Sequence, residues 1–322
     1  MVKTVKKKTK NDPFISVVMP CYNARRTIAA SLTAILNQKV AFDYEVIVVD
    51  CSDDGTEEIV QSGFPQVRLI HLGQLESPGS KRNLGVRYAR GEIIAFTDSD
   101  CLPPPDWLAQ IVDHHKRIDA DGIGGCVING YPHGLATLVS HLIEFNEWTE
   151  RTPEGYMRNI PTSNLSFKRE TFRKYQVCFM DIYPNEDTLF NWTLSERGAK
   201  IYFSPRLCVV HMKKVKMGNL LLHQFEFGKG SAETRRISSL PGKVFVKYPI
   251  LCVGLPFIRW FRATLRFAEC DLKTLLLFWL VTPFYLAAVG AWSLGFMTRG
   301  RYLSPGPRFP IEGPVADAPN PF

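Results

Sequence analysis

The feature that most constrains this chain is an alternation of short apolar runs and helix-like segments over residues 14–130. The runs are rich in β-branched residues and are bounded by turn residues, as buried strands are. Strands joined by helices imply right-handed crossovers and a mostly parallel sheet, so we expect an α/β fold. The expected strands are Ile15–Pro20, Glu45–Asp50, Val67–Leu72 and Glu92–Thr97, and the expected helices are 24–38, 79–90 and 105–118.

Polar side chains follow these strands at the points where the strands end. Tyr22 and Asn23 follow the first strand and Asp50 closes the second. Asp98 and Asp100 follow the fourth. Ligands of open α/β sheets bind beyond the carboxyl ends of the strands, so these residues predict a binding site there.

Residues 131–240 show a mixed pattern of helical and strand-like segments. Within them the stretch 212–240 is basic and polar and contains Gly228-Lys229-Gly230. The expected elements are a helix near 134–149, a strand near Asn164–Phe167, a helix near 186–197, and short strands at Lys200–Phe203 and Leu207–His211.

Residues 243–302 include Thr274–Met297, a run of 24 residues without a charge. As one helix this run would be about 36 Å long, enough to cross a hydrocarbon core of about 30 Å, so we predict a membrane span. A buried core helix is the alternative. Val244–Phe261 carries charges and prolines, and either a second span or a helix in the membrane interface fits it. Two spans would keep Arg299 and Arg301 beside the preceding domain, on the cytoplasmic face of the cell membrane.

Most of the net charge of +8 comes from the start of the N-terminal tail (1–13), at Met1–Lys10. Five lysines lie in Met1–Lys10 and leave a balance of only +3 for the rest of the chain, which is not the broad basic footprint of a nucleic-acid binder. Such a tail can contact anionic lipid or remain solvated. The Pro-rich end, 303–322, is expected to be disordered.

The eight cysteines form no C-x-x-C pair. This spacing argues against a zinc ribbon and against a dense disulfide framework. Scattered cysteines without pairing suit a reducing compartment.

Asp98-Ser99-Asp100 places two carboxylates after a strand, with a spacing that suits a divalent cation and the diphosphate it bridges. Alone, the motif is explained equally well by a solvated turn. It belongs, however, to an ordered set: Val17-Val18-Met19-Pro20-Cys21-Tyr22-Asn23, Val48-Val49-Asp50 with Asp53-Asp54-Gly55-Thr56, Ser80-Lys81-Arg82-Asn83-Leu84-Gly85, and Trp107-Leu108. In this order and spacing the chain resembles the family 2 glycosyltransferases of the GT-A fold, over about residues 14–230.

The resemblance implies a Rossmann-like mixed sheet flanked by helices, a nucleotide-sugar donor, Mg²⁺ or Mn²⁺, and inversion at the anomeric carbon. It divides the GT-A domain, 14–240, into a nucleotide-binding half, 14–130, and an acceptor half, 131–240. The nucleotide-binding residues that it implies are Pro20, Tyr22, Asn23, Asp50, Lys81, Arg82, Asp98 and Ser99. The metal ligands that it implies are Asp98, Asp100 and His211, and Asn164 is assigned to the floor of the sugar pocket.

Asn185-Glu186-Asp187 resembles the acidic signature at the start of the family's acceptor-side helix. An inverting transferase needs a base that takes the proton of the acceptor hydroxyl. The resemblance assigns this role to Asp187, with Glu186 as the alternative base. An acidic pair in a first helical turn is also ordinary stabilisation of the helix dipole.

These features predict a hexosyltransferase that moves one sugar, from a UDP-sugar, to a lipid-linked saccharide at a membrane during polysaccharide synthesis. Single addition is expected because residues 223–236 lack the Gln-x-x-Arg-Trp signature of processive synthases. Two alternatives stay open: a polyprenyl-phosphate acceptor, whose anionic oxygen needs no base, and an inactive membrane scaffold. A nucleotidyltransferase would need a Gly-rich loop after the first strand, and Cys21–Thr27 contains no glycine.

Overall fold

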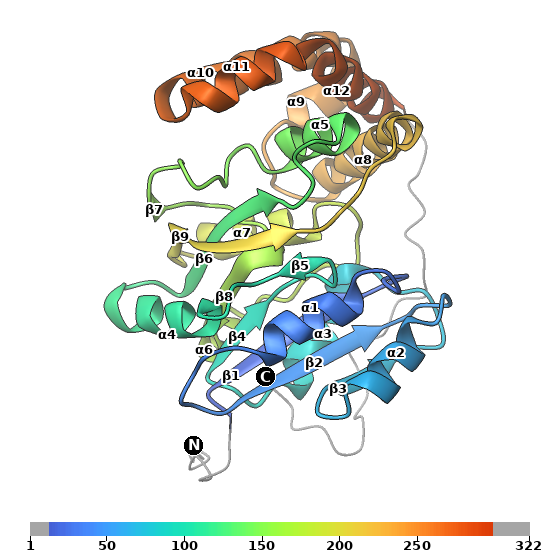
Figure 1. Ribbon diagram of the computed structural model, residues 1–322. Coiled ribbons are helices and arrows are strands. Elements are labelled where there is room, and N and C mark those ends of the chain that lie inside the picture. Colours follow the sequence, from blue (N-terminus) through green and yellow to red (C-terminus); the bar gives the residue numbers. More distant parts are fainter. Residues whose placement is uncertain (1–12, 299–322) are drawn as a thin grey trace.

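The computed structural model describes residues 13–298 (Figure 1). The predicted terminal tails lie outside these residues, apart from Pro13, and so do Arg299 and Arg301. Its strands are β1 (Ile15–Cys21), β2 (Tyr44–Asp50), β3 (Arg68–His71), β4 (Ile93–Phe96), β5 (Cys101–Leu102), β6 (Gly122–Asn129), β7 (Gly155–Tyr156), β8 (Leu165–Lys168) and β9 (Ile201–His211). They form one mixed sheet in the order β3-β2-β1-β4-β8-β6-β9-β5, with β7 beside β9.

The first four strands confirm the predicted parallel half of the sheet. Chain order runs from β1 through α1 (Ile28–Leu36) to β2 on one side, while α3 (Pro78–Tyr88) returns to β4 on the other side of β1. The carboxyl ends of β1 and β4 are therefore the point where the winding direction reverses. Ligands of open α/β sheets bind at such a point.

The other half of the sheet pairs in both directions, with β8 antiparallel to β4 and β6, and β9 parallel to β6. Residues 201–211 form one strand, whereas the sequence predicted two short ones. The register of β6 against β9 shifts between Gly125 and Cys126, so Pro205, Arg206 and Leu207 have no partner in β6. Proline cannot donate a ladder hydrogen bond and tends to occupy such irregularities, which explains the apparent gap in the sequence pattern.

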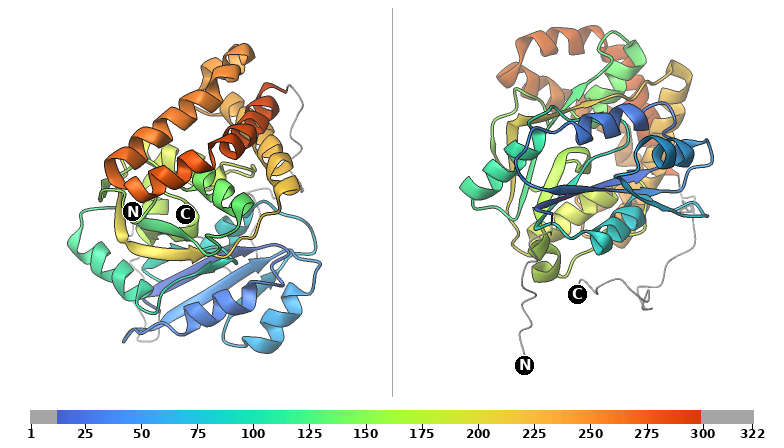
Figure 2. Two further views of the ribbon diagram at one scale, coloured as in Figure 1. Left: turned by 45° about the horizontal axis from the view of Figure 1, so that its top comes forward. Right: turned by 60° about the horizontal axis from the view of Figure 1, so that its bottom comes forward.

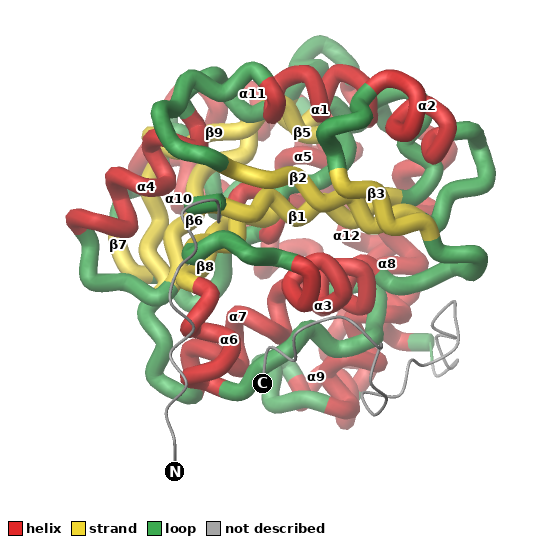
Figure 3. The backbone as a smooth tube through the Cα atoms, turned by 90° about the horizontal axis from the view of Figure 1, so that it is seen from below, coloured by secondary structure: helices red, strands yellow, loops and turns green. Residues whose placement is uncertain are grey.

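Helices cover both faces of this sheet (Figure 3). On one face α1, α2 (Thr56–Gly63) and α4 (Trp107–Arg117) bury an apolar core that includes Ile28, Val60 and Trp107. On the other face α3, α6 (Arg169–Tyr175) and α7 (Glu186–Glu196) bury a second core that includes Val86 and Phe190. The GT-A layers expected from the resemblance are therefore present.

The remaining helices gather at one end of the sheet (Figures 1 and 2). They are α5 (Leu135–Glu144), α8 (Met217–Ile237), α9 (Lys243–Lys247), the 3-10 helix Pro249–Gly254, α10 (Leu255–Cys270), α11 (Leu272–Leu280) and α12 (Thr282–Met297). A third apolar core joins α5 and α8 to the last three helices. Its buried side chains include Val139, Leu220, Phe267 and Tyr285. The C-terminal helices α10, α11 and α12 thus pack against α5 and α8.

Two glycines let α8 and α12 approach closely. A Cβ at Gly228 would lie 2.0 Å from the carbonyl oxygen of Trp292, and one at Gly295 would lie 1.9 Å from that of Phe225. Neither distance is possible for a real side chain. The basic, Gly-containing stretch of the sequence is therefore a long helix whose glycine forms a helix crossing.

The prediction of one continuous span at Thr274–Met297 is wrong, because the run is broken into α11 and α12, which bend by 74°. Within residues 13–298, no single helix has the length and apolar composition of a membrane span, and only this bent pair does when taken together. Pro283 follows the break, and proline is favoured in the first turn of a helix but not inside one. Residues 244–261 are also divided, among α9, the 3-10 helix and α10.

One pair of cysteines is bonded, whereas the sequence suggested cysteines without pairing. Cys126 of β6 and Cys208 of β9 are register partners and form a disulfide, and the other six are free. The two residues are 82 positions apart in the sequence, and the pairing of β6 with β9 brings them together.

Candidate active site

A cavity of about 530 Å³ opens beyond the carboxyl ends of β1 and β4, where the topology predicts a ligand. Its walls come from loops that are distant in the sequence, including those after β1, β3 and β4 and the start of α7. The predicted site residues that line it are Pro20, Tyr22, Lys81, Arg82, Asp98, Ser99, Asp100, Glu186 and Asp187. The structure therefore gathers most of the predicted site into one place.

Arg82 of α3 connects the two acidic motifs. Its Nη1 donates to Oε1 of Glu186 at 2.7 Å, and its Nη2 donates to Oδ1 of Asp98 at 3.1 Å. Burial raises the pKa of Glu186, and the charge of Asp187 raises it further, against the effect of Arg82. One guanidinium thus holds two carboxylates that lie about 90 residues apart in sequence (98 and 186).

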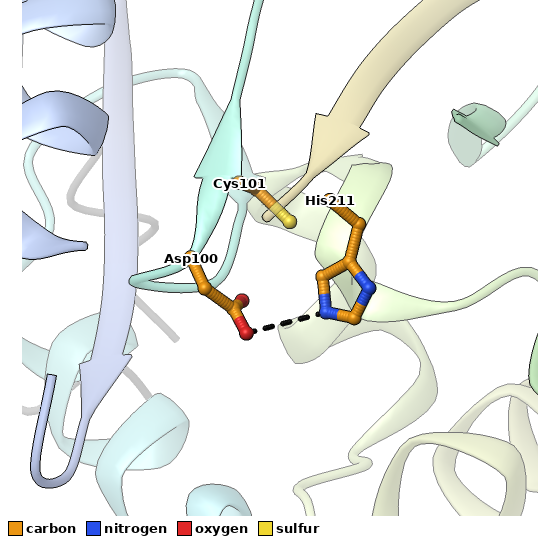
Figure 4. A group of neighbouring side chains, drawn as sticks. All are labelled: Asp100, Cys101 and His211. Carbon is orange, nitrogen blue, oxygen red and sulfur yellow. Dashed lines mark ion pairs between the residues drawn. The ribbon is translucent and has the colours of Figure 1, made fainter. Parts of the chain in front are cut away.

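Asp100 and His211 form a second pair, shown in Figure 4. Nε2 of His211 lies 3.3 Å from Oδ2 of Asp100, because β5 places Cys101 opposite His211 at the end of β9. Burial opposes ionisation of Asp100, but the hydrogen bond and charge of His211 outweigh it, so the pKa of Asp100 is lowered. His211 shows the converse: burial lowers its pKa, and Asp100 raises it by more.

These groups have the donor chemistry of a divalent-cation site. Asp100, Cys101 and His211 bring their ligand atoms within 4.8 Å of one another, and Asp98 lies in the same cavity wall. Burial raises the pKa of Cys101 well above its usual range, and sulfur is a soft ligand that suits Mg²⁺ and Mn²⁺ less well than oxygen does. The carboxylates of Asp98 and Asp100 are the hard oxygen ligands that Mg²⁺ and Mn²⁺ prefer. The residues therefore fit such an ion through Asp98, Asp100 and His211.

Tyr22 and Lys81 also line the cavity. The ring of Tyr22 is half exposed, and Nζ of Lys81 lies 5.6 Å from its centroid. Lys81 is buried and donates to the carbonyl oxygen of Cys21 at 2.8 Å, so it also fixes the end of β1. An exposed aromatic face beside a cation can take a planar nucleobase.

Asn23 and Asp50 do not line the cavity. The side-chain oxygen of Asn23 accepts from the backbone N–H of Asp53 at 3.1 Å, which ties the loop after β1 to the loop after β2. Asp50 is fully buried, and its carboxylate accepts from the backbone and hydroxyl of Ser52 and faces Nδ1 of His71 at 2.8 Å. Their predicted contact with a nucleotide stays a prediction.

Asn164 does not reach the cavity either, because its side chain is fully buried and fully bonded. Its amide donates to the carbonyl oxygens of Cys126 and Leu207, and its oxygen accepts from the indole N–H of Trp107 at 2.9 Å. It therefore ties β6 and β9 to α4. The wall position expected for Asn164 is occupied by Thr162 and Ser163, which precede it.

Glu76, Ser77 and Ser163 line the cavity and were missed from the sequence. Oε2 of Glu76 and the hydroxyl of Ser163 are buried without a hydrogen-bond partner in the described part of the chain. A signal existed for Ser77, since it caps α3 immediately before Pro78 and accepts from the N–H of Ser80 at 3.1 Å. Unpartnered polar atoms facing a cavity indicate that a polar ligand completes them.

Asp187 stands at the far wall, at the start of α7. Its Oδ1 accepts from the backbone N–H of Thr188 at 2.6 Å. Its Oδ2 makes no hydrogen bond within residues 13–298. The preceding residue, Asn185, has a left-handed backbone with φ of 78°, and the peptide between Tyr183 and Pro184 is cis. This turn places Asp187 in the cavity across from the nucleotide-side motifs.

Comparison with known proteins agrees with this geometry. The family model described as Glycosyl transferase family 2 matches residues 16–182, more than half of the chain. Glycosyltransferase AglE of Haloferax volcanii is 27% identical over 230 residues, covering 70% of this chain and 75% of AglE. WfgD of Escherichia coli, named a UDP-Glc:alpha-D-GlcNAc-diphosphoundecaprenol beta-1,3-glucosyltransferase, is 32% identical over 103 residues, which are 31% of this chain and 38% of WfgD.

A solved structure is similar over almost the whole chain. It is the mannosyltransferase PcManGT from Pyrobaculum calidifontis in complex with GDP-Man and Mn²⁺, with a TM-score of 0.57 and 19% identity. It covers 89% of this chain and 88% of PcManGT. The order of the motifs, the cavity that they build and the family match lead to one conclusion: the chain belongs to glycosyl transferase family 2.

Proposed function

We propose that this protein is an inverting hexosyltransferase that moves one sugar from a nucleotide-sugar, a UDP-sugar in the first instance, to a lipid-linked saccharide. The observation that carries the proposal is the single cavity that Asp98, Asp100 and Asp187 line together. We name this the donor cavity. A transfer reaction needs a donor side and an acceptor side in one space, and the cavity supplies both.

The residues of the donor cavity have different roles in this proposal. The ring of Tyr22 takes the base, and Asp98 and Asp100, with His211, hold a divalent ion against the diphosphate. When bound, that ion offsets the negative charge that builds on the leaving diphosphate. Arg82 keeps the Asp98 and Glu186 carboxylates in place through its two ion pairs.

Asp187 acts on the acceptor side. The acceptor oxygen attacks the anomeric carbon, the bond from that carbon to the diphosphate oxygen breaks, and the hydroxyl proton passes to Oδ2 of Asp187. Attack opposite the leaving group inverts the configuration at carbon. Glu186 is less suited to this role because its carboxylate is held by Arg82.

The printed names of the relatives support the choice of substrates. WfgD is named for UDP-Glc as donor and a diphosphoundecaprenol-linked sugar as acceptor. TarS of Staphylococcus aureus, 32% identical over 130 residues, is named a poly(ribitol-phosphate) beta-N-acetylglucosaminyltransferase. Both names describe building of large glycans or polymers, so a role in cell-surface glycan synthesis is part of the proposal.

We place the protein at the cell membrane, with the donor cavity on the cytoplasmic face. Support comes from α10, an amphipathic helix with arginines at 259, 262 and 266 on one side and exposed apolar side chains on the other. The exposed apolar residues of α10 are Phe257, Ile258, Phe261 and Leu265. This pattern is typical of a helix that lies in a membrane interface, as the sequence allowed for 244–261. The bent pair α11 and α12 adds further apolar surface.

A donor and acceptor screen tests the proposal. Membranes that contain the full chain are incubated with Mn²⁺, with UDP-, dTDP- or GDP-sugars, and with a sugar diphosphate-lipid or a polyprenyl phosphate. We expect nucleoside diphosphate release from a UDP-sugar, stimulated by the saccharide-bearing lipid. Stimulation by polyprenyl phosphate alone would move the acceptor to the alternative, and no release from any donor would favour an inactive scaffold.

A further inference from the structure

A second cavity, of about 580 Å³, adjoins the donor cavity and leads toward the C-terminal helices. The two share five lining residues: Phe145, Pro161, Asn185, Asp187 and Phe227. Asp187, the proposed base, therefore lines both spaces. We call the second space the arginine cavity, because Arg235, Arg259, Arg262 and Arg266 line it.

Three of these four arginines have no carboxylate partner within residues 13–298. Arg266 pairs with Glu147 at 2.8 Å. Arg235 donates only to backbone oxygens, those of Ser231 and Pro241. Burial and, to a smaller extent, the neighbouring charge of Arg259 together lower the pKa of Arg235 to about 10. Buried cations that lie close together lose hydration and repel one another. A bound anion offsets both costs.

The acidic residues of the cavity do not supply that anion. Glu144 is held by Lys213 at 3.3 Å and by the hydroxyl of Ser140 at 2.8 Å. Glu147 pairs with Arg266 and also acts on Arg259 through its charge. In the described part of the chain, neither Glu147 nor Asp187 forms an ion pair with Arg235, Arg259 or Arg262.

Gln224 of α8 provides an independent sign of a ligand. Its side chain is 1% exposed and lines the arginine cavity, and its Nε2 donor has no hydrogen-bond partner in the described residues. A buried donor without a partner costs about 1–3 kcal/mol, so such groups are normally satisfied in the working protein. Like the arginines, it offers N–H groups and requires an acceptor.

We propose that the arginine cavity binds the phosphate or diphosphate of the lipid-linked acceptor, with Arg259 and Arg262 as its main ligands and Gln224 as a further donor. This inference rests on the proposed function and specifies its acceptor. The sugar end would then reach Asp187, which faces the same cavity. Guanidinium groups are well matched to phosphate oxygens, because they donate in pairs from one plane.

The surroundings suit a lipid-bound phosphate. Arg259 lies 5.1 Å from the ring centroid of Trp292, and Arg235 lies 5.8 Å from that of Phe296, so aromatic rings flank the charges. On α10 the arginines face the cavity while Phe257 and Phe261 are exposed on the opposite side. The helix that supplies the arginines thus also carries an exposed apolar surface that can contact lipid.

Binding measurements with the full chain in detergent micelles test this assignment. Chelator is added so that the metal-dependent donor site does not compete, and the probes are farnesyl diphosphate and uncharged farnesol. We expect the diphosphate to bind more tightly than farnesol. Arg259→Gln and Arg262→Gln should each weaken diphosphate binding by about 10–100-fold, since a charged hydrogen bond contributes about 1.5–3 kcal/mol. The matched control is Arg236→Gln, which removes an exposed arginine next to Arg235 that pairs with Glu233 outside the cavity.

Equal affinity of wild type and both arginine variants would overturn the proposal. So would variants that bind phosphatidylglycerol vesicles less well but keep their affinity for farnesyl diphosphate, because the arginines would then meet lipid headgroups. Donor hydrolysis with water as acceptor separates this inference from the catalytic one. We expect the arginine variants to keep this donor hydrolysis. If the chain hydrolyses no donor but still binds the diphosphate through its arginines, the proposed catalytic function fails and the present inference is supported.

Discussion

In the donor cavity the buried charges are paired with one another: Arg82 holds Asp98 and Glu186, and His211 holds Asp100. In the arginine cavity three cations have no carboxylate partner in the described chain. The first arrangement has more carboxylates than cations at its walls, as a site that recruits a metal ion does. The second has free cations, as a site that recruits an anion does. The two cavities meet at Asp187, and under our proposal their opposite charge deficits would orient a donor and an acceptor toward it.

Removing a metal ligand should have the largest effect. We expect Asp100→Ala to lower turnover by about 10⁴-fold, since loss of the ion removes several kcal/mol of stabilisation of the leaving diphosphate. The measurement is release of nucleoside diphosphate at saturating Mn²⁺, together with Mn²⁺ affinity. Asp53→Ala is the control, because Asp53 is exposed in the loop after β2 and does not line the cavity. Full wild-type activity in excess chelator would contradict the metal assignment.

Asp187→Asn tests the boundary between the cavities. The change keeps the volume and removes the proton acceptor, so turnover with a saccharide acceptor should fall by roughly 10³-fold, within the range for general bases. Nucleotide affinity should stay within a factor of about two, because the donor-side groups are untouched. Purified variant with saturating donor provides the readout. Near-normal turnover here, combined with loss in Glu186→Gln, would transfer the role to Glu186.

The wall of the arginine cavity depends on the crossing of α8 and α12. Gly228→Ala should lower the free energy of unfolding by about 1–3 kcal/mol, because the new methyl group would meet the carbonyl of Trp292. Gly218→Ala on the same helix has no atom within 4 Å of its Cβ, and it should gain up to about 1 kcal/mol in helix propensity. Thermal unfolding in detergent compares the two. Equal shifts would show that the crossing is looser than the structure has it.

The smallest effect concerns the pH dependence of the donor cavity. Because the pKa of Glu186 is raised in the folded chain, the folded state binds more protons than the unfolded state between the usual carboxyl range and the raised pKa. The free energy of unfolding therefore falls as pH rises through that window, by at most about 1.4 kcal/mol per pH unit from this group. Glu186→Gln removes this titration, so its melting temperature should gain on the wild type from about pH 5 to about pH 8. A constant difference would refute the raised pKa.

The chemistry of the donor cavity was predictable because its residues follow strands. Asp98 and Asp100 were expected at the end of β4, and the sheet does bring them to Lys81 and Arg82. Asn23 and Asn164 show the limit of such reasoning. Both are polar, and both follow or precede a strand near the cavity, yet their side chains bond to other loops and strands. Position along the chain predicts the edge of the sheet, but it does not predict which way a side chain turns.

The arginine cavity was not predictable from the sequence. Arg259 was read only as a charge that interrupts an apolar segment, and Gln224 as part of a basic stretch. Their meeting depends on the break between α11 and α12 and on the crossing of α8 with α12. Local patterns contain no information on contacts between helices of similar composition, because apolar faces can pack in several ways.

The sequence by itself determined the parallel half of the sheet, the carboxylates at the end of β4 and the family, because strand patterns and motif spacing are local properties of the chain. The tertiary structure decided that the C-terminal apolar run bends into two helices. It also decided that Cys126 meets Cys208, and that Asp187 faces two cavities rather than one. These features arise from packing between segments that are far apart in sequence, where burial of apolar surface and close approach at Gly228 and Gly295 select one arrangement among many.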